Sequence, residues 1–187
     1  MTLSTNQFKN GNHIEVENVI YKIIDFQHVK PGKGPAFVRT KLRRVSDSAV
    51  IDKTFRAGEK FRSIHTESRK MQYLYEDGTG AHFMDNESYE QLEVPLSSVA
   101  ESLKWIRPNE NIDLLFVDGE PGDINLPASV ELEVTFTEPG ERGNTASGGG
   151  DKPATLETGA EIMVPLFIKI GEKIKVQTET GSYMSRA

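Results

Sequence analysis

Residues 28–43 read HVKPGKGPAFVRTKLR and hold a turn followed at once by a strand pattern. From Val38 to Arg43, uncharged side chains alternate strictly with basic ones, as in a strand with one packed and one exposed face. The turn is nearly symmetric about Lys33. Proline restricts the loop and glycine permits positive φ without side-chain bulk, so we predict a slim hairpin with Lys33 at its apex. The other residues of the predicted tip are Pro31, Gly32, Gly34 and Pro35.

The rest of the chain repeats short strand patterns separated by turns. These segments are rich in Val, Ile, Phe, Tyr and Thr, which predicts an all-β protein. Asp-Gly pairs at 77–78 and 118–119 are strong hairpin signals. Apolar residues at spacings of three and four over residues 96–106 predict one short helix. The predicted strands cover residues 13–16, 19–28, 36–45, 50–55, 71–75, 81–84, 112–117, 120–125, 130–137, 161–168 and 173–178.

Turn-rich breaks near residues 62–66 and 127–129 divide the chain into three units. Each unit has about 60 residues, enough for one five- or six-stranded barrel. We therefore predict three small β-barrel domains, and we read the glycine-rich stretch 142–150 as a loop of the third. The predicted domains cover residues 1–63, 64–127 and 128–187.

The composition is that of an ordinary folded protein, with 187 residues, 36% hydrophobic and 27% charged. No apolar run approaches the roughly 18 residues of a membrane span, and the N-terminal residues show no secretory signal, so we expect a cytoplasmic protein with no membrane partner. The chain has no cysteine, and its four histidines lack the close spacing of zinc ligands. We expect no metal site and no cofactor.

The charge is unevenly distributed along the chain. The net charge is −6, yet residues 1–63 hold 12 basic and 6 acidic residues, a net charge of +6, whereas residues 64–187 hold 10 and 22, a net charge of −12. No acidic residue lies between Asp25 and Asp47. A basic shaft below a thin lysine tip suits a groove walled by phosphates, so we predict RNA as a partner. The predicted RNA-binding residues, besides Lys33, are Lys30, Arg39, Lys41, Arg43 and Arg44.

Enzyme motifs are absent from the sequence. A nucleotide-binding loop would place Ser or Thr directly after Lys33, where this chain has Gly34 and Pro35. There is no G-x-S-x-G elbow and no H-E-x-x-H motif, and the glutamates at 87, 90 and 93 are read as a solvated face. We therefore expect a protein that is not an enzyme. The hairpin by itself also fits a purely structural surface loop.

Long stretches of the chain resemble bacterial elongation factor P. Besides residues 28–43, they are YLYEDG at 73–78, FMDNESYEQ at 83–91 and the whole segment 152–187. The resemblance runs from end to end. It implies an SH3-like, KOW-type barrel followed by two OB-type barrels, arranged in an L whose outline is like tRNA.

The resemblance also implies a function on the ribosome. Members of that family are monomeric translation factors that bind between the peptidyl and exit tRNA sites, contact ribosomal RNA of both subunits and peptidyl-tRNA, and relieve stalling at consecutive prolines by stimulating peptide bond formation. Lys33 occupies the tip position, which points toward the peptidyl-transferase centre and is often extended by a modifying enzyme. A lysine at this position excludes arginine rhamnosylation, and the sequence leaves open β-lysylation, a pentanol-type adduct or no modification.

In the third domain, the resemblance assigns two further RNA contacts. Family members carry Gly-Asp-Thr in a loop that approaches the exit-site codon, whereas this chain has Gly143, Asn144 and Thr145. Asparagine replaces an anionic acceptor with a neutral group that both donates and accepts, so we expect the contact to be kept and its base preference altered. Tyr183 and Arg186 match family positions that face small-subunit RNA.

Two other interpretations remain open from the sequence. One is a general OB-fold protein that binds single-stranded RNA through phosphate contacts and aromatic stacking. The other is a diverged paralogue resembling elongation factor P, which the largely intact third-domain signature disfavours.

Overall fold

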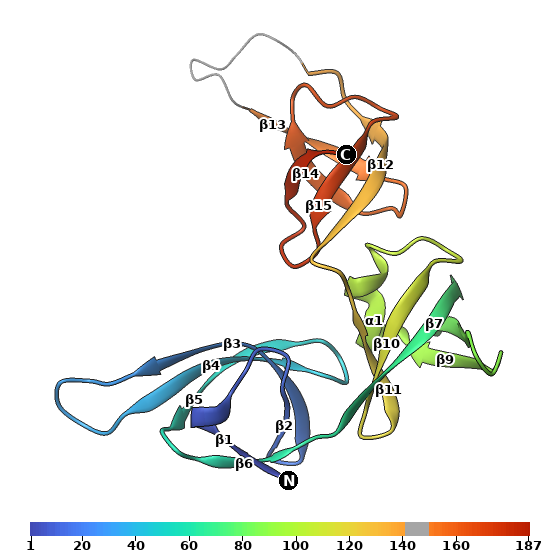
Figure 1. Cartoon of the computed structure of the whole chain (residues 1–187). Helices are drawn as coiled ribbons and strands as arrows, with labels where there is room; N and C mark the ends of the chain where they lie inside the picture. The colour runs from blue at the N-terminus through green and yellow to red at the C-terminus, as the bar shows by residue number, and fades with distance from the viewer. Residues whose placement is uncertain (141–149) are drawn as a thin grey trace. The chain divides into compact units, whose positions relative to one another are not determined.

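The computed structural model describes residues 1–140 and 150–187 (Figure 1). All eleven predicted strands and the predicted helix are present in this part of the chain, which confirms the all-β fold class. The helix, α1 (Leu96–Leu103), begins directly after Pro95, and a single 3-10 turn covers Thr5–Gln7. No helix of the described residues is long and apolar enough to cross a membrane.

The strands form three antiparallel sheets. In sheet order, the first contains β1 (Thr2–Ser4), β6 (Lys60–Ser63), β2 (His13–Val16), β3 (Val19–Val29), β4 (Phe37–Arg44) and β5 (Val50–Arg56). The second contains β11 (Glu120–Asn125), β10 (Asn111–Val117), β7 (Thr66–Glu76), β8 (Gly80–Asp85) and β9 (Gln91–Pro95). The third contains β14 (Glu161–Pro165), β13 (Asp151–Leu156), β12 (Ser129–Thr137), β15 (Lys173–Gln177) and β16 (Tyr183–Arg186).

The sequence patterns missed β1, β6, β9, β13 and β16. These strands are short, and several carry residues that weaken a strand signal, such as Pro153 in β13 and Glu93 in β9. Each forms because a neighbouring strand offers free backbone groups, as β8 does for β9 from Gly80↔Pro95 to Met84↔Gln91. The predicted strand 161–168 ends earlier, at Pro165.

Each sheet buries one face in an apolar core. In the first sheet, alternate residues of β4 are buried, with Val38, Thr40 and Leu42 inside as the alternation predicted. The largest fully buried side chains of the second sheet are Phe83, Met71 and Leu114. The third core is lined by Leu132, Val134, Leu156, Val164, Ile168, Ile174 and Val176, with Trp105 packed against it.

The chain divides into two compact units, one formed by Met1–Glu101 with Asn111–Ile124 and the other by Ser102–Glu110 with Asn125–Ala187. The first unit contains two of the three sheets. Inside it, β11 comes so close to the first sheet that a Cβ at Gly122 would lie 2.9 Å from Val45 Cγ1. The division into three domains at residues 63 and 127 stays a prediction.

Candidate functional site: the hairpin of β3 and β4

The predicted hairpin is present and carries Lys33 in the middle of its loop. β3 and β4 pair from Tyr21↔Arg44 to Val29↔Phe37, which leaves residues 30–36 unpaired. This loop projects beyond the strands of its sheet, in blue in Figure 1. Gly34 has φ +109°, a conformation that L side chains rarely adopt. The backbone conformation of the Pro-Gly-Lys-Gly-Pro turn therefore explains why at least its second glycine is needed.

The Lys33 side chain is free to meet a partner. The residue is exposed, and so are both neighbouring glycines and Pro35. None of the ion pairs formed by residues 1–140 and 150–187 involves Lys33. The lysine is neither folded against its own sheet nor neutralised by a carboxylate.

Aromatic side chains anchor the base of the hairpin. Phe26 on β3 lies edge-on to Phe8, with ring centroids 6.3 Å apart, and Phe8 lies edge-on to Phe55 at the same distance. Phe61 completes the cluster, 4.5 Å from Phe55. Edge-to-face rings add to the stability gained from burying apolar area. The cluster therefore ties β3 to β5 and β6 just below the part of the hairpin that projects.

The outer face of β4 presents Arg39 and Lys41, which are both exposed. The Arg39 guanidinium lies 5.7 Å from the centroid of the Phe37 ring, within the range of a cation–π contact. In the sheet register, Lys41 stands opposite Asp25 and Asp52, which lower the positive potential around it without forming a close ion pair. With Lys30, which is also exposed, these side chains continue the positive surface from the tip along the shaft.

Arg43 has an intramolecular partner that the sequence did not indicate. Its Nη2 donates to Asp123 Oδ2 at 2.5 Å, and Lys22 Nζ donates to the same oxygen at 3.1 Å. Lys22 and Arg43 face each other across β3 and β4, while Asp123 is buried on β11 of the second sheet. The trio therefore joins the two strands of the hairpin to the neighbouring sheet. No motif links residues 80 or more positions apart, so this contact could not be found from the sequence.

Arg44 is also held within the molecule. Its Nη1 donates to Asp47 Oδ2 at 2.7 Å, and hydrogen bonding with Tyr21 and Asp47 raises the pKa of Arg44. Of the predicted RNA-binding residues, Lys30, Arg39 and Lys41 are exposed, whereas Arg43 and Arg44 are partly buried and paired. The structure therefore brings four cations of the predicted set, including Lys33, to the free surface of the hairpin.

The remaining predicted contacts belong to the second compact unit. Gly143, Asn144 and Thr145 lie outside the described residues. Tyr183 is half-buried and packs against the third core. Arg186 forms an ion pair with Glu172, with Nε 3.4 Å from Oε2, and its guanidinium lies 4.8 Å from the centroid of the Phe167 ring. Both side chains are partly occupied by contacts inside their own unit.

Comparison with known proteins agrees with this geometry. The sequence matches three family profiles in succession: "Elongation factor P (EF-P) KOW-like domain" over residues 4–61, "Elongation factor P (EF-P) OB domain" over 66–124, and "Elongation factor P, C-terminal" over 130–186. The chain belongs to the elongation factor P family. It is accordingly a translation elongation factor that acts on the ribosome, as predicted.

Individual relatives cover the full length of the chain. Elongation factor P of Desulfitobacterium hafniense (strain DSM 10664 / DCB-2) is 51% identical over 185 residues, which is 99% of this chain and 100% of that protein. Those of Moorella thermoacetica and Acidothermus cellulolyticus are 51% and 48% identical over 99% and 98% of this chain, and over 100% and 98% of those proteins. Among solved structures, "Eukaryotic translation initiation factor 5A from Methanococcus jannaschii" has a TM-score of 0.53 and 23% identity, covering 67% of this chain and 92% of that one, a likeness of fold.

Proposed function

We propose that this factor binds between the peptidyl and exit tRNA sites of the ribosome and inserts Lys33 toward the peptidyl-transferase centre. The observation that carries the proposal is the exposed, unpaired Lys33 in a narrow loop on an anchored hairpin. A lysine ammonium offers three donors to phosphate and ribose oxygens. Lys30, Arg39 and Lys41 would contact phosphates along the shaft, which fixes the position of the hairpin without reading base sequence.

The contribution of the factor to catalysis is positional and involves no covalent step by the protein. Proline is a rigid secondary amine and reacts poorly, so a peptidyl-tRNA that samples many orientations stalls at consecutive prolines. Holding the ester carbonyl in a productive orientation lowers the activation barrier, because part of the entropy is already lost when the factor binds. On this proposal the factor speeds peptide bond formation without being an enzyme.

The proposal extends to further partners. Ribosomal RNA of both subunits and peptidyl-tRNA would be bound by a monomer, with Gly143, Asn144 and Thr145 near the exit-site codon and Tyr183 and Arg186 against small-subunit RNA. A lysine-modifying enzyme would act on Lys33, which its glycine neighbours leave accessible. Intact-mass measurement of natively produced protein tests this last point, because an adduct would add its mass to the protein, and digestion would then assign that mass to the peptide that contains Lys33.

Replacing Lys33 by alanine tests the proposed function. Lys33→Ala should abolish stimulation of translation through consecutive prolines in a reconstituted system, because the only change is loss of the cation at the tip. The control is Lys60→Ala, which removes an exposed lysine from β6 of the same sheet and should keep full activity. Matching thermal unfolding curves would show that both variants fold. Undiminished rescue by Lys33→Ala would overturn the proposal.

A further inference from the structure

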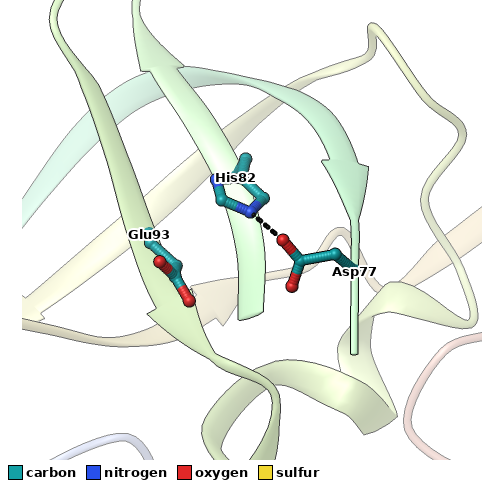
Figure 2. A group of neighbouring side chains, drawn as sticks. All are labelled: Asp77, His82 and Glu93. Carbon is teal, nitrogen blue, oxygen red and sulfur yellow. Dashed lines mark hydrogen bonds and ion pairs between the residues drawn. The ribbon is translucent and has the colours of Figure 1, made fainter. Parts of the chain in front are cut away.

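Three potential metal ligands come together on the second sheet, away from the hairpin. They are Asp77 in the turn after β7, His82 on β8 and Glu93 on β9, shown as sticks in Figure 2. Each residue offers one donor atom, and these atoms all lie within 4.8 Å of one another. The three residues span 17 positions of sequence, and their spacing matches no metal-binding motif. The spacing of the histidines in the sequence therefore predicted no metal site.

The Asp77 carboxylate is fixed in place by its own turn. Its Oδ1 accepts hydrogen bonds from the backbone N–H groups of Thr79 at 2.9 Å and Gly80 at 3.0 Å. Two backbone donors on one oxygen hold the carboxylate in a fixed orientation. Oδ2 is left to face His82, whose Nε2 lies 2.8 Å away.

The His82 ring is also held in one orientation. It stacks on Tyr75 of β7, with centroids 4.5 Å apart and planes 25° from parallel. Tyr75 and Glu93 are the register partners of His82 on its two sides. Stacking on one side and the Asp77 carboxylate at Nε2 restrict rotation of the imidazole, so its nitrogen stays directed at the cluster (Figure 2).

Gly80 leaves room for the third ligand. A Cβ built at this position would overlap with the Glu93 side chain, including its carboxylate. Gly80 does not have positive φ, so the backbone conformation by itself does not require glycine there. The missing side chain lets the Glu93 carboxylate lie against β8 near the Asp77 turn, where the Thr79 hydroxyl is 2.9 Å from Asp77 Oδ1 and 3.2 Å from Glu93 Oε1.

We propose that Asp77, His82 and Glu93 bind a divalent transition-metal ion, with zinc as the best match, and leave a coordination position open to solvent. Imidazole nitrogen and carboxylate oxygen are both zinc ligands, and three protein ligands leave the fourth tetrahedral position open. Mg²⁺ and Ca²⁺ prefer oxygen ligands only, so the imidazole disfavours them. Two carboxylates and a neutral imidazole balance the 2+ charge, and the ion would replace the His82–Asp77 hydrogen bond and link β7, β8 and β9.

Zinc titration of the untagged, full-length, chelator-treated protein tests this site. We expect saturable uptake of one Zn²⁺ per chain at micromolar concentration and near-neutral pH, and visible absorption bands when Co²⁺ replaces it. Glu93→Gln keeps the shape of the side chain and should weaken binding roughly tenfold or more, as should His82→Ala. His65→Ala, which removes an exposed histidine outside the cluster, should leave the affinity unchanged.

A pair of glycine substitutions makes a second, independent test. Gly80→Ala should weaken zinc binding because its Cβ displaces the Glu93 carboxylate, whereas Gly78→Ala, in open space two residues away, should not. Zinc should also raise the melting temperature of the wild-type protein and of Gly78→Ala, but not that of His82→Ala. The proposal is overturned if no saturable zinc uptake occurs, or if Glu93→Gln and His82→Ala bind zinc as the wild type does.

Discussion

Asp123 is a buried carboxylate that forms ion pairs with two cations of another sheet. Its side chain is 6% exposed, whereas those of Lys22 and Arg43 are 21% and 25% exposed. Removing a charge from water is costly, and two close cations compensate for that cost here. The residue therefore stabilises the approach of β11 to the hairpin strands.

Replacing Asp123 by asparagine should destabilise the protein by about 2 kcal/mol. The value lies below that for a fully buried pair, since water still reaches Lys22 and Arg43 and can solvate them once they are unpaired. Urea unfolding followed by circular dichroism measures the change. Asp118→Asn is the control, because Asp118 pairs with Arg62 at the exposed surface and should change stability by less than about 0.5 kcal/mol. Equal effects of the two substitutions would contradict the special role of Asp123.

His13 should make stability depend on pH. Burial, reinforced by the nearby charge of Lys22, lowers the pKa of His13 from 6.5 to about 4. Above pH 6.5 the imidazole is neutral in both the folded and the unfolded chain, so stability is complete. As the pH falls from 6.5 toward 4, the unfolded chain binds a proton there and the folded chain does not. The free energy of unfolding should therefore fall by about 3 kcal/mol over this range.

Urea unfolding at intervals between pH 7 and pH 4.5 measures this slope. Carboxylates of the unfolded chain, with reference pKa values of about 3.9 and 4.3, also begin to titrate near the lower limit, so a variant is needed to isolate the contribution of His13. His13→Gln cannot take up the proton and should lose this part of the slope. A slope that persists in the variant would assign it to other groups.

At the scale of elements, the hairpin combines a stiff shaft with a tip of defined conformation. The shaft is held by uninterrupted pairing of β4 with β5 and by pairing of β4 with β3, in which the register shifts between Ile23 and Asp25. The tip depends on backbone conformation, since its residues make few contacts. Gly32 and Gly34 differ in this respect: a Cβ would cause no clash at either position, but only Gly34 has positive φ.

We therefore expect different outcomes when each of the two glycines is replaced by alanine. Gly34→Ala should shift the loop to a conformation that an L residue tolerates and reduce polyproline rescue several-fold, although Lys33 is still present. Gly32→Ala adds the same methyl group in an allowed conformation and should act nearly as the wild type does. The same translation assay used for Lys33→Ala compares them, and similar activities for the pair would show that tip conformation is unimportant.

At the scale of the whole molecule, the uneven charge separates ribosome binding from general RNA binding. Residues 64–187 carry a net charge of −12 and should repel free RNA, while the hairpin retains four exposed cations. Each lysine or arginine that contacts phosphate releases counterions on binding. The affinity for the ribosome should therefore depend on salt through a small number of side chains.

Arg39→Ala and Lys41→Ala should each reduce the magnitude of one slope by about 1: the slope of log affinity for the ribosome against log salt concentration. Lys60→Ala should leave the slope unchanged. Filter binding to unstructured RNA completes the comparison, because the intact chain should bind it far more weakly than ribosomes. Tight binding without ribosomes would favour the interpretation as a general single-strand RNA binder.

Much of this protein could be derived from patterns within short segments. The alternation in residues 38–43 correctly placed Val38, Thr40 and Leu42 inside and Arg39 and Lys41 outside, because side chains of a strand point to opposite faces in turn. The Pro-Gly-Lys-Gly-Pro turn placed Lys33 in an exposed loop, because proline and glycine constrain their own backbone wherever they occur. The motifs also indicated the family, which the three matching profiles confirm.

Other features were decided only by the tertiary structure. Strands such as β9 and β13 form because a neighbouring strand supplies backbone hydrogen-bond partners. Arg43 is not free to bind RNA as predicted, because it pairs with Asp123, which is 80 residues away in the sequence. The cluster of Asp77, His82 and Glu93 likewise depends on the register of three strands. The sequence by itself determined what each segment does alone: its strand pattern, its turn and its charge. Which charged side chains form ion pairs was decided only by the folded structure. The energy of an ion pair depends on the distance between its charges, and residues far apart in sequence come close together only when the chain is folded.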